Sequence, residues 1–135
     1  MFLVKNKLSS KIKSSLTNNK KSFEIPFSWF VLEVLDLLDK NNFIGGFSFV
    51  SSKLPNSNLK PLLRVSLKTT QNNFKGINNF KLISKPSKRV FVNYKTLTFL
   101  AQTNNSLILS TQKGLLLSSE ALHLKVGGEV LYLLT

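Results

Sequence analysis

Apolar and polar residues follow two different periods in the first half of the chain, and these periods predict two helices and three strands. Apolar residues at near-helical spacing in residues 3–16 fit a helix, and the alternation in residues 23–27 fits a short strand. In residues 29–40 apolar positions surround a polar line of acids, as in a helix packed against a sheet. Residues 47–50 and 63–67 alternate again, so the predicted order is helix, strand, helix, strand, strand.

Polar and glycine residues mark the predicted ends of these elements. Ser28 precedes the second helix as a candidate N-cap, and the pair Asn41-Asn42 is predicted to end that helix. Two glycines in residues 43–46 predict a turn into the next strand, and residues 55–60 predict a loop before the strand that follows.

The second half of the chain is predicted to be rich in strands. Residues 80–84, 90–94 and 107–109 have the apolar content of strands. Residues 97–102 predict one or two helical turns, and a loop follows at residues 103–105.

A short helix and an apolar strand are predicted after these elements. Two serines and a glutamate at residues 118–120 are predicted to cap a helix that runs to Lys125. Serine hydroxyls accept from free amides, and an acid in the first turn complements the helix dipole. The glycine pair at residues 127–128 predicts a turn into the strand at residues 130–134.

A polar stretch with one glycine, residues 70–79, separates the two halves of the chain. We therefore predict an α+β fold with two small subdomains joined by this linker. Residues 1–69 are expected to form an N-terminal helix, strand, helix, strand, strand unit. Residues 80–135 are expected to form a β-rich C-terminal unit with one short helix.

The chain carries a large positive charge. Nineteen lysines and arginines stand against six acids among 135 residues, which gives a net charge of +13 at pH 7. This balance indicates a polyanionic partner and a salt-dependent interaction, and it favours nucleic acid over a membrane. A membrane span needs about 20 apolar residues in a row. The longest apolar-rich segment, residues 27–38, is interrupted by Glu33 and Asp36.

Residue types that catalysis and metal binding require are scarce. The sequence has no cysteine, which excludes disulfides and thiolate metal sites. His123 is its one histidine, which disfavours a zinc site or a Ser-His-Asp site. The six acids are scattered and offer little for general acid and base chemistry. We therefore expect no enzyme activity, no cofactor, no metal and no small-molecule substrate.

The first 23 residues contain no acid and include six lysines, and they allow two interpretations. A serine-rich, basic, amphipathic start is typical of a mitochondrial import peptide. The same residues also suit a helix of the mature protein that places Lys11 and Lys13 on phosphates.

Two loops near the last strands are the strongest functional candidates. The first loop offers hydroxyls, an amide, a cation and a glycine, in the order Ser110, Thr111, Gln112, Lys113 and Gly114. The second loop has the glycine pair followed by Glu129. Hydroxyls donate and accept hydrogen bonds, glycine lets a backbone come close, and lysine neutralises a phosphate, so these loops suit an RNA groove.

A third basic segment is predicted at a hairpin tip, where a proline presets the backbone of a turn. The segment consists of Lys85, Pro86, Ser87, Lys88 and Arg89. Its three cations either form a solvated tip or contact an RNA backbone, and the sequence leaves both interpretations open.

Several linked motifs, in this order, resemble those of protein eight of the small ribosomal subunit in its bacterial type. Residues 110–130 resemble the family's Ser-Thr-Ser-Lys-Gly motif followed by Gly-Gly-Glu, and residues 83–90 resemble its Ser-Lys-Pro-Gly-x-Arg segment. Residues 25–28 resemble its Ile-Pro-Tyr-Ser, and residues 8–13 resemble its first helix, Leu-Thr-Arg-Ile-Arg. The resemblance covers nearly the whole chain. It puts the family's first helix near Leu8, which favours the mature helix over the import peptide.

The resemblance implies a ribosomal RNA binder that seats on a helix in the central domain of small-subunit RNA and helps to order that domain during assembly. It also implies neighbouring ribosomal proteins as partners. The residues that we expect to contact RNA are Ser110, Thr111, Gln112, Lys113, Gly114, Glu129, Lys85, Pro86, Ser87, Lys88, Arg89, Phe91, Lys11, Lys13 and Ser28.

Different roles are expected for these residues. The cations of the two basic segments are expected on phosphates, and Ser110 and Thr111 on sugar or base edges. Glu129 either accepts from a base amino group, braces the loop, or orients the amides of the glycine turn. Gln112 and Phe91 stand where the family has a serine and a tyrosine, and Trp29 stands where a lysine is common. Because hydroxyls are lost, binding is expected to depend more on lysine charge.

Other interpretations remain open. A free regulatory protein that binds messenger RNA is the alternative function, and a membrane-surface protein or an RNA-processing enzyme is less favoured. The frequent lysine, asparagine, phenylalanine and isoleucine fit an AT-rich coding sequence. We therefore expect an organelle-encoded protein of the mitochondrial small ribosomal subunit, with a plastid or the bacterial cytoplasm as alternatives.

Overall fold

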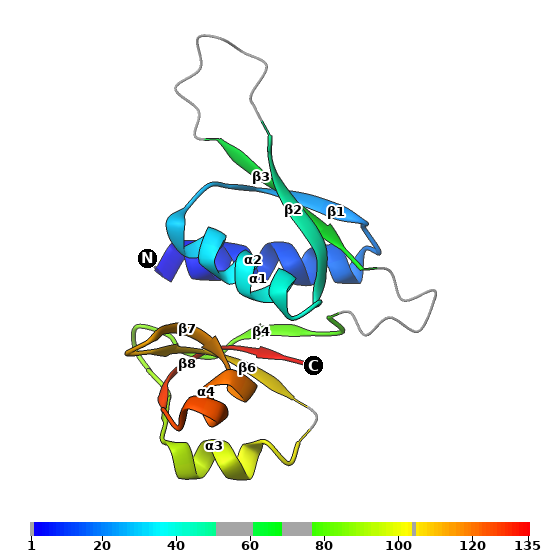
Figure 1. Cartoon of the computed structure of the whole chain (residues 1–135). Helices are drawn as coiled ribbons and strands as arrows, with labels where there is room; N and C mark the ends of the chain where they lie inside the picture. Colours follow the sequence, from blue (N-terminus) through cyan, green and yellow to red (C-terminus); the bar gives the residue numbers. More distant parts are fainter. Residues whose placement is uncertain (1, 51–60, 69–76, 104) are drawn as a thin grey trace. The chain divides into compact units, whose positions relative to one another are not determined.

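The fold is described from a computed structural model, shown in Figure 1, which describes residues 2–50, 61–68, 77–103 and 105–135. Contacts between Cα atoms divide the chain into two units, Leu3–Ile77 and Asn78–Thr135. Both units mix helices with antiparallel strands, which confirms the predicted α+β class. The predicted loop at residues 55–60 and most of the predicted linker lie outside the described residues.

The N-terminal unit is a three-stranded antiparallel sheet with both helices on one side of it (Figure 1). Its elements are α1 (Phe2–Thr17), β1 (Ser22–Pro26), α2 (Trp29–Lys40), β2 (Ile44–Val50) and β3 (Leu62–Leu67). The strand order is β1-β3-β2, so β3 is the central strand. The predicted order of elements is confirmed, and α2 begins and ends at the predicted residues.

The buried side chains of this unit follow the two periods seen in the sequence. Leu8 and Ile12 on α1 are four residues apart and both are fully buried, as expected for one face of a helix. Phe23 and Ile25 are the buried residues of β1, two positions apart on one face of the strand. Each such apolar side chain contributes about 1.5–3 kcal/mol on burial, so the amphipathic pattern stabilises the packing of the helices on the sheet.

Two details of the N-terminal unit differ from the prediction. β2 begins at Ile44, three residues earlier than predicted. Ile44 and Gly46 both pair with β3, and Gly45 lies at a bulge between them, so the glycines belong to the strand and do not form a separate turn. Ser28 occupies the N-cap position of α2 in extended conformation, but its side chain makes no capping hydrogen bond.

The C-terminal unit is a five-stranded antiparallel sheet with two short helices (Figure 1). Its elements are β4 (Phe80–Leu82), β5 (Phe91–Val92), α3 (Tyr94–Leu100), β6 (Ser106–Thr111), β7 (Gly114–Leu117), α4 (Ser118–Leu124) and β8 (Gly128–Leu134). Four strands follow the order β4-β8-β6-β7. β5 pairs with the first residues of β8 and β4 with its last residues.

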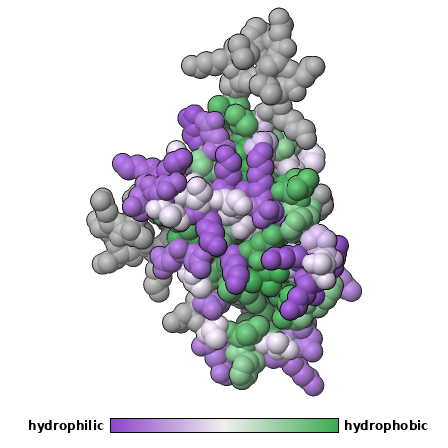
Figure 2. Space-filling model, turned by 180° about the vertical axis from the view of Figure 1, so that it is seen from behind, coloured by the Kyte–Doolittle hydropathy of each residue, from purple (hydrophilic) through white to green (hydrophobic). Residues whose placement is uncertain are grey.

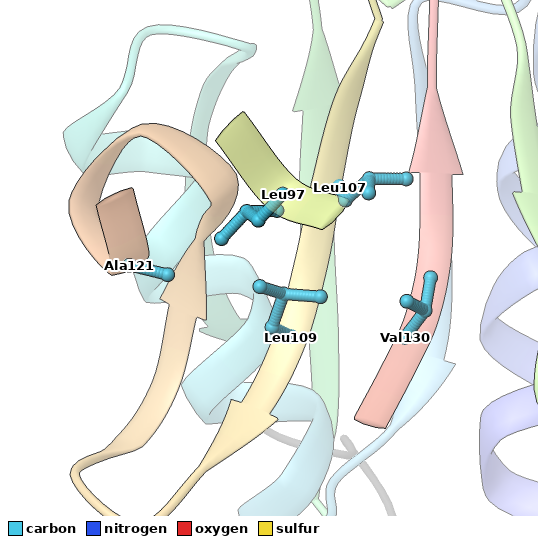
Figure 3. Close-up of a cluster of buried hydrophobic side chains, with 5 residues drawn as sticks. All are labelled: Leu97, Leu107, Leu109, Ala121 and Val130. Carbon is cyan, nitrogen blue, oxygen red and sulfur yellow. The ribbon is translucent and has the colours of Figure 1, made fainter. Parts of the chain in front are cut away.

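A buried cluster joins the two helices of this unit to its sheet (Figure 3). Its members are Leu97 of α3, Leu107 and Leu109 of β6, Ala121 of α4 and Val130 of β8. Leu109 and Val130 are paired across β6 and β8 and both face the cluster. Because successive side chains of a strand point to opposite faces, the residues next to this pair face away from the helices.

The C-terminal unit corrects three predictions. The strand predicted at residues 90–94 ends at Val92, because the Asn93 side chain accepts a hydrogen bond of 2.8 Å from the Thr96 amide and starts α3 there. The helical turns predicted at residues 97–102 are confirmed as α3, which begins three residues earlier, at Tyr94. The unit therefore contains two helices, where one short helix was predicted for it as a whole.

The predicted serine cap of α4 is also wrong. Leu117 holds the N-cap position, and Ser118 is the first residue of the helix. The Ser118 hydroxyl accepts from the Leu107 amide at 3.2 Å, so this serine ties the helix start to β6. Lys125 ends the helix in a left-handed conformation, with φ of 57°.

Candidate nucleic-acid interface

A row of four side chains crosses four strands of the C-terminal sheet. Ser110 on β6 lies opposite Leu115 on β7 and opposite Glu129 on β8, and Glu129 lies opposite Phe91 on β5. Residues paired in this way place their side chains on the same face of a sheet. The row therefore joins a hydroxyl, a carboxylate and an aromatic ring that are far apart in the sequence.

The glycine pair before Glu129 allows the strands to come close enough to form this row. A Cβ atom on Gly128 would collide with the backbone oxygen of Ser110, and one on Gly127 would collide with the backbone oxygen of Val92. Neither glycine has a positive φ. The pair is thus required for close packing, whereas the sequence had indicated only a turn.

The tip between β6 and β7 is held by the hydroxyl of Thr111. This hydroxyl accepts from the Lys113 amide at 3.1 Å and donates to the Gly114 carbonyl at 2.9 Å. Gly114 has φ of 98°, a conformation that favours glycine. Gln112 and Lys113 form the exposed turn. The local bonds keep the turn compact while its amide and ammonium groups point to solvent.

The predicted hairpin tip at the second basic segment is confirmed. Lys85 and Lys88 exchange two backbone hydrogen bonds of 3.0 Å, with Pro86 and Ser87 in the turn between them. Both lysines are exposed.

Ser84 anchors this basic tip to β8. Its buried hydroxyl accepts from the Val90 amide at 3.1 Å and donates to the Val130 carbonyl. The Val130 amide in turn donates to the Val90 carbonyl at 2.9 Å. The sequence did not identify Ser84 as a site residue, because its partner on β8 is 46 positions away.

Glu129 forms an ion pair that the sequence did not predict. Its carboxylate lies 3.6 Å from the Arg89 guanidinium, and the Glu129 side chain is only 16% exposed. This distance is too long for a hydrogen bond, and the arginine side chain is largely exposed, so the pair contributes at most about 1 kcal/mol. It sets a positive group beside the carboxylate.

The structure brings twelve of the fifteen predicted contact residues into the C-terminal unit. The other three, Lys11, Lys13 and Ser28, belong to the N-terminal unit. Lys11 and Lys13 are both exposed on α1, but residues two positions apart in a helix do not face each other. Lys11 lines a hollow of about 510 Å³. Lys20, Arg64 and Glu24 are the other charged residues of its lining.

The described residues also limit other kinds of site. No helix among them is long and apolar enough to cross a membrane. Within the same residues no three side chains of the histidine, cysteine, aspartate or glutamate type are grouped as metal ligands.

Burial raises the pKa of Tyr132, a core residue of β8 that packs against Phe80 with ring centroids 4.6 Å apart.

The face in Figure 2 carries many hydrophilic side chains, with smaller hydrophobic patches between them. The mixed α+β fold, the paired strands and the two tips that carry lysine together describe a class of small basic proteins whose sheet surface mixes polar and apolar side chains.

Comparisons with known proteins agree on one family. The model of the family described as Ribosomal protein S8 matches residues 4–134. The small ribosomal subunit protein uS8 of Pelagibacter ubique is 33% identical over 122 residues, which cover 90% of this chain and 88% of that relative. The uS8 protein of Rhizobium rhizogenes is also 33% identical over 122 residues, covering 90% of this chain and 89% of the relative. That of Nautilia profundicola is 35% identical over 98 residues, covering 73% and 71%.

This chain therefore belongs to the ribosomal protein S8 family. The resemblance found in the sequence motifs is confirmed. The family is one of structural ribosomal proteins and not a class of enzymes.

Proposed function

We propose that this protein is a structural component of the small ribosomal subunit that binds the central domain of small-subunit ribosomal RNA and supports assembly and translation. The observation that carries the proposal is the row across the sheet, in which Ser110, Glu129 and Phe91 offer a hydroxyl, a carboxylate and a ring. The basic segment at residues 85–89 comes just before Phe91, and the β6–β7 tip with Lys113 comes just after Ser110. Membership of the ribosomal protein S8 family supports the same conclusion. Neighbouring small-subunit proteins are the further partners that we propose.

The exposed groups of this surface suit the shallow groove of an RNA helix. Double-stranded RNA displays 2′-hydroxyls and phosphates there, and it is recognised largely by shape. Ser110 offers a hydroxyl to sugar or base edges, and Lys113 offers an ammonium group to a phosphate. Lys85 and Lys88 do the same from the second tip. Phe91, which is 68% exposed, offers a ring on which an unpaired base stacks.

We assign a supporting role to Glu129. Its ion pair with Arg89 keeps the guanidinium beside the row. The carboxylate also remains able to accept from a base amino group next to Ser110. This arrangement reconciles a carboxylate with a surface that binds a polyanion.

Lys11, Lys13 and Ser28 are proposed as additional contacts from the N-terminal unit. The lysines are exposed on a helix that has no acid, so they are available to phosphates. Ser28 is half-buried and lines a hollow beside Trp29.

We propose the mitochondrial small ribosomal subunit as the location, with a plastid or the bacterial cytoplasm as alternatives. The support is compositional, since lysine, asparagine, phenylalanine and isoleucine are abundant. Epitope tagging and gradient sedimentation of organelle lysates test it. Sedimentation with bacterial-type cytoplasmic subunits instead would contradict the mitochondrial assignment.

Sedimentation and binding together test the function. The tagged chain is expected in the small-subunit fraction, and the purified protein is expected to bind a central-domain RNA fragment more tightly than an unrelated RNA of the same length. Recovery in the ribosome-free supernatant, bound to messenger RNA, would instead support the regulatory alternative. Equal affinity for both RNA fragments would refute a specific central-domain site.

A further inference from the structure

Three aromatic rings form an exposed patch in the N-terminal unit. The sheet surface described above belongs to the C-terminal unit, so the patch shares no residue with it. The Phe27 ring lies between the others, 5.3 Å from the Trp29 centroid and 5.7 Å from the Phe49 centroid. Trp29 is 73% exposed and Phe49 is 60% exposed. We call Phe27, Trp29 and Phe49 the aromatic patch.

The aromatic patch is fixed by the fold and is not part of the core. Phe27 follows β1, and its amide donates to the Pro61 carbonyl at 2.8 Å. Trp29 is the first residue of α2, and Phe49 lies near the end of β2 opposite Leu63 of β3. The Phe27 and Trp29 rings meet edge-on at 73°. Because most of the indole is in solvent, burial in the core does not explain a tryptophan at this position.

A hollow of about 550 Å³ adjoins the aromatic patch. It is lined by Phe27, Ser28 and Trp29, by Val4 and Lys7 of α1, and by Ile25, Pro26 and Val31. Among the described residues, Lys7 is the charged member of this lining, and none of the lining residues is a carboxylate. Glu33 lies one helical turn beyond Trp29 on α2 and is exposed, outside the lining. The hollow thus combines an exposed indole, a hydroxyl and one cation.

We propose that the aromatic patch is a second RNA site, which stacks an unpaired base on Trp29 and places the adjoining phosphate on Lys7. Aromatic rings beside cations are the combination that binds single-stranded nucleic acid, because every base has a π-face and every linkage carries a negative charge. This site is distinct from the sheet surface, which presents hydroxyls and paired strands to a folded RNA helix.

Charge favours RNA over a protein partner at this patch. The helix that supplies Lys7 has four lysines and no acid. The cores of protein interfaces are depleted in lysine, whereas a phosphate backbone attracts it. Phe27 also fixes the position of the indole before binding, which lowers the cost of ordering it.

Fluorescence of the intact chain tests the proposal, because Trp29 is its one tryptophan. Titration with an unstructured oligouridylate of about ten nucleotides is expected to quench the indole emission, as stacking does. In a second measurement, anisotropy of an end-labelled oligouridylate reports affinity without the indole. Trp29→Ala is expected to weaken this affinity about tenfold, and Trp29→Phe is expected to retain most of it.

Phe99→Ala is the matched control, because Phe99 is an exposed aromatic residue of α3 in the other unit. It is expected to leave both readouts unchanged, and circular dichroism checks that each variant folds. Three results would overturn the proposal: no quenching by oligouridylate, equal affinity of Trp29→Ala and the parent chain, or a shift of Trp29 emission caused only by RNA-free small-subunit proteins. The last result would assign the patch to a protein partner.

Discussion

The β6–β7 tip and the start of β8 meet at the Ser110–Glu129 pair, and each depends on glycine for a different physical reason. Gly114 at the tip has φ of 98°, and an added Cβ atom would meet nothing within 4 Å. Gly128 at the start of β8 has no positive φ, but an added Cβ atom would collide with Ser110. Gly114 is needed for its backbone conformation, and Gly128 is needed because no side chain fits there.

The two glycines therefore stand in parts of the surface with different roles. The start of β8 sets the shape of the sheet, and the β6–β7 tip adds exposed side chains to it. The tip is a local structure, held by bonds within Thr111 to Gly114. The start of β8 is fixed by neighbours on two other strands. Changes at the tip should therefore alter binding with a small loss of stability, whereas changes at the glycine pair should disturb the whole sheet.

The largest effect is expected from Gly128→Ala. The added methyl group meets a backbone oxygen that cannot move without shifting β6, so we expect a loss of about 3 kcal/mol in the free energy of unfolding and loss of RNA binding. Urea denaturation followed by circular dichroism measures the first and a binding titration the second. A variant within about 0.5 kcal/mol of the parent would show that the strands are not closely packed here.

A smaller effect is expected from Gly114→Ala. The positive φ strains an alanine, which costs about 1–2 kcal/mol, although space is open around it. Asparagine tolerates such conformations better, so Gly114→Asn should be less damaging than Gly114→Ala. At Gly128 the order should reverse, because asparagine is the larger side chain. Denaturation experiments measure the stability of all four variants. If alanine and asparagine rank in the same order at both positions, the two glycines are not needed for different reasons.

Thr111→Val should cost about 1 kcal/mol, since it removes the hydroxyl that bridges the Lys113 amide and the Gly114 carbonyl. We expect faster hydrogen exchange at the Lys113 amide and weaker RNA binding. Thr111→Ser keeps the hydroxyl and serves as the control. Equal exchange rates in the valine and serine variants would show that the hydroxyl does not hold the tip.

The smallest effect is expected from Lys113→Ala. Loss of one phosphate contact should make the plot of log affinity against log salt shallower by about one unit, with little change in stability. Lys95→Ala removes the same charge from α3, and Lys95 has no place in the proposed surface. Identical slopes for the two variants would mean that position 113 contributes only to the net charge.

The pattern of the sequence predicted the elements that depend on local physics. The helix at residues 29–40 was predicted with both ends correct, because its apolar face and the flanking polar residues are all local signals. The start of α3 also had a local signal, since Asn93 stands three positions before Thr96, as an N-cap does. The run of apolar residues before Asn93 favoured a strand and concealed this signal.

Contacts between distant residues were beyond the sequence pattern. Ser84 and Val130 are 46 positions apart, and their hydrogen bond exists only once β8 lies beside the basic tip. Arg89 and Glu129 are likewise joined by the sheet. The glycine pair was recognised as important, but its steric role follows from strand packing, which no local pattern encodes.

Crosslinking from position 113 in the intact small subunit tests the central claim most directly. A photoreactive residue placed there should attach to the central domain of small-subunit RNA, because the exposed tip is proposed to lie against that RNA. Attachment only to protein, or only to RNA outside the central domain, would contradict the proposal that this sheet surface binds the central-domain helix.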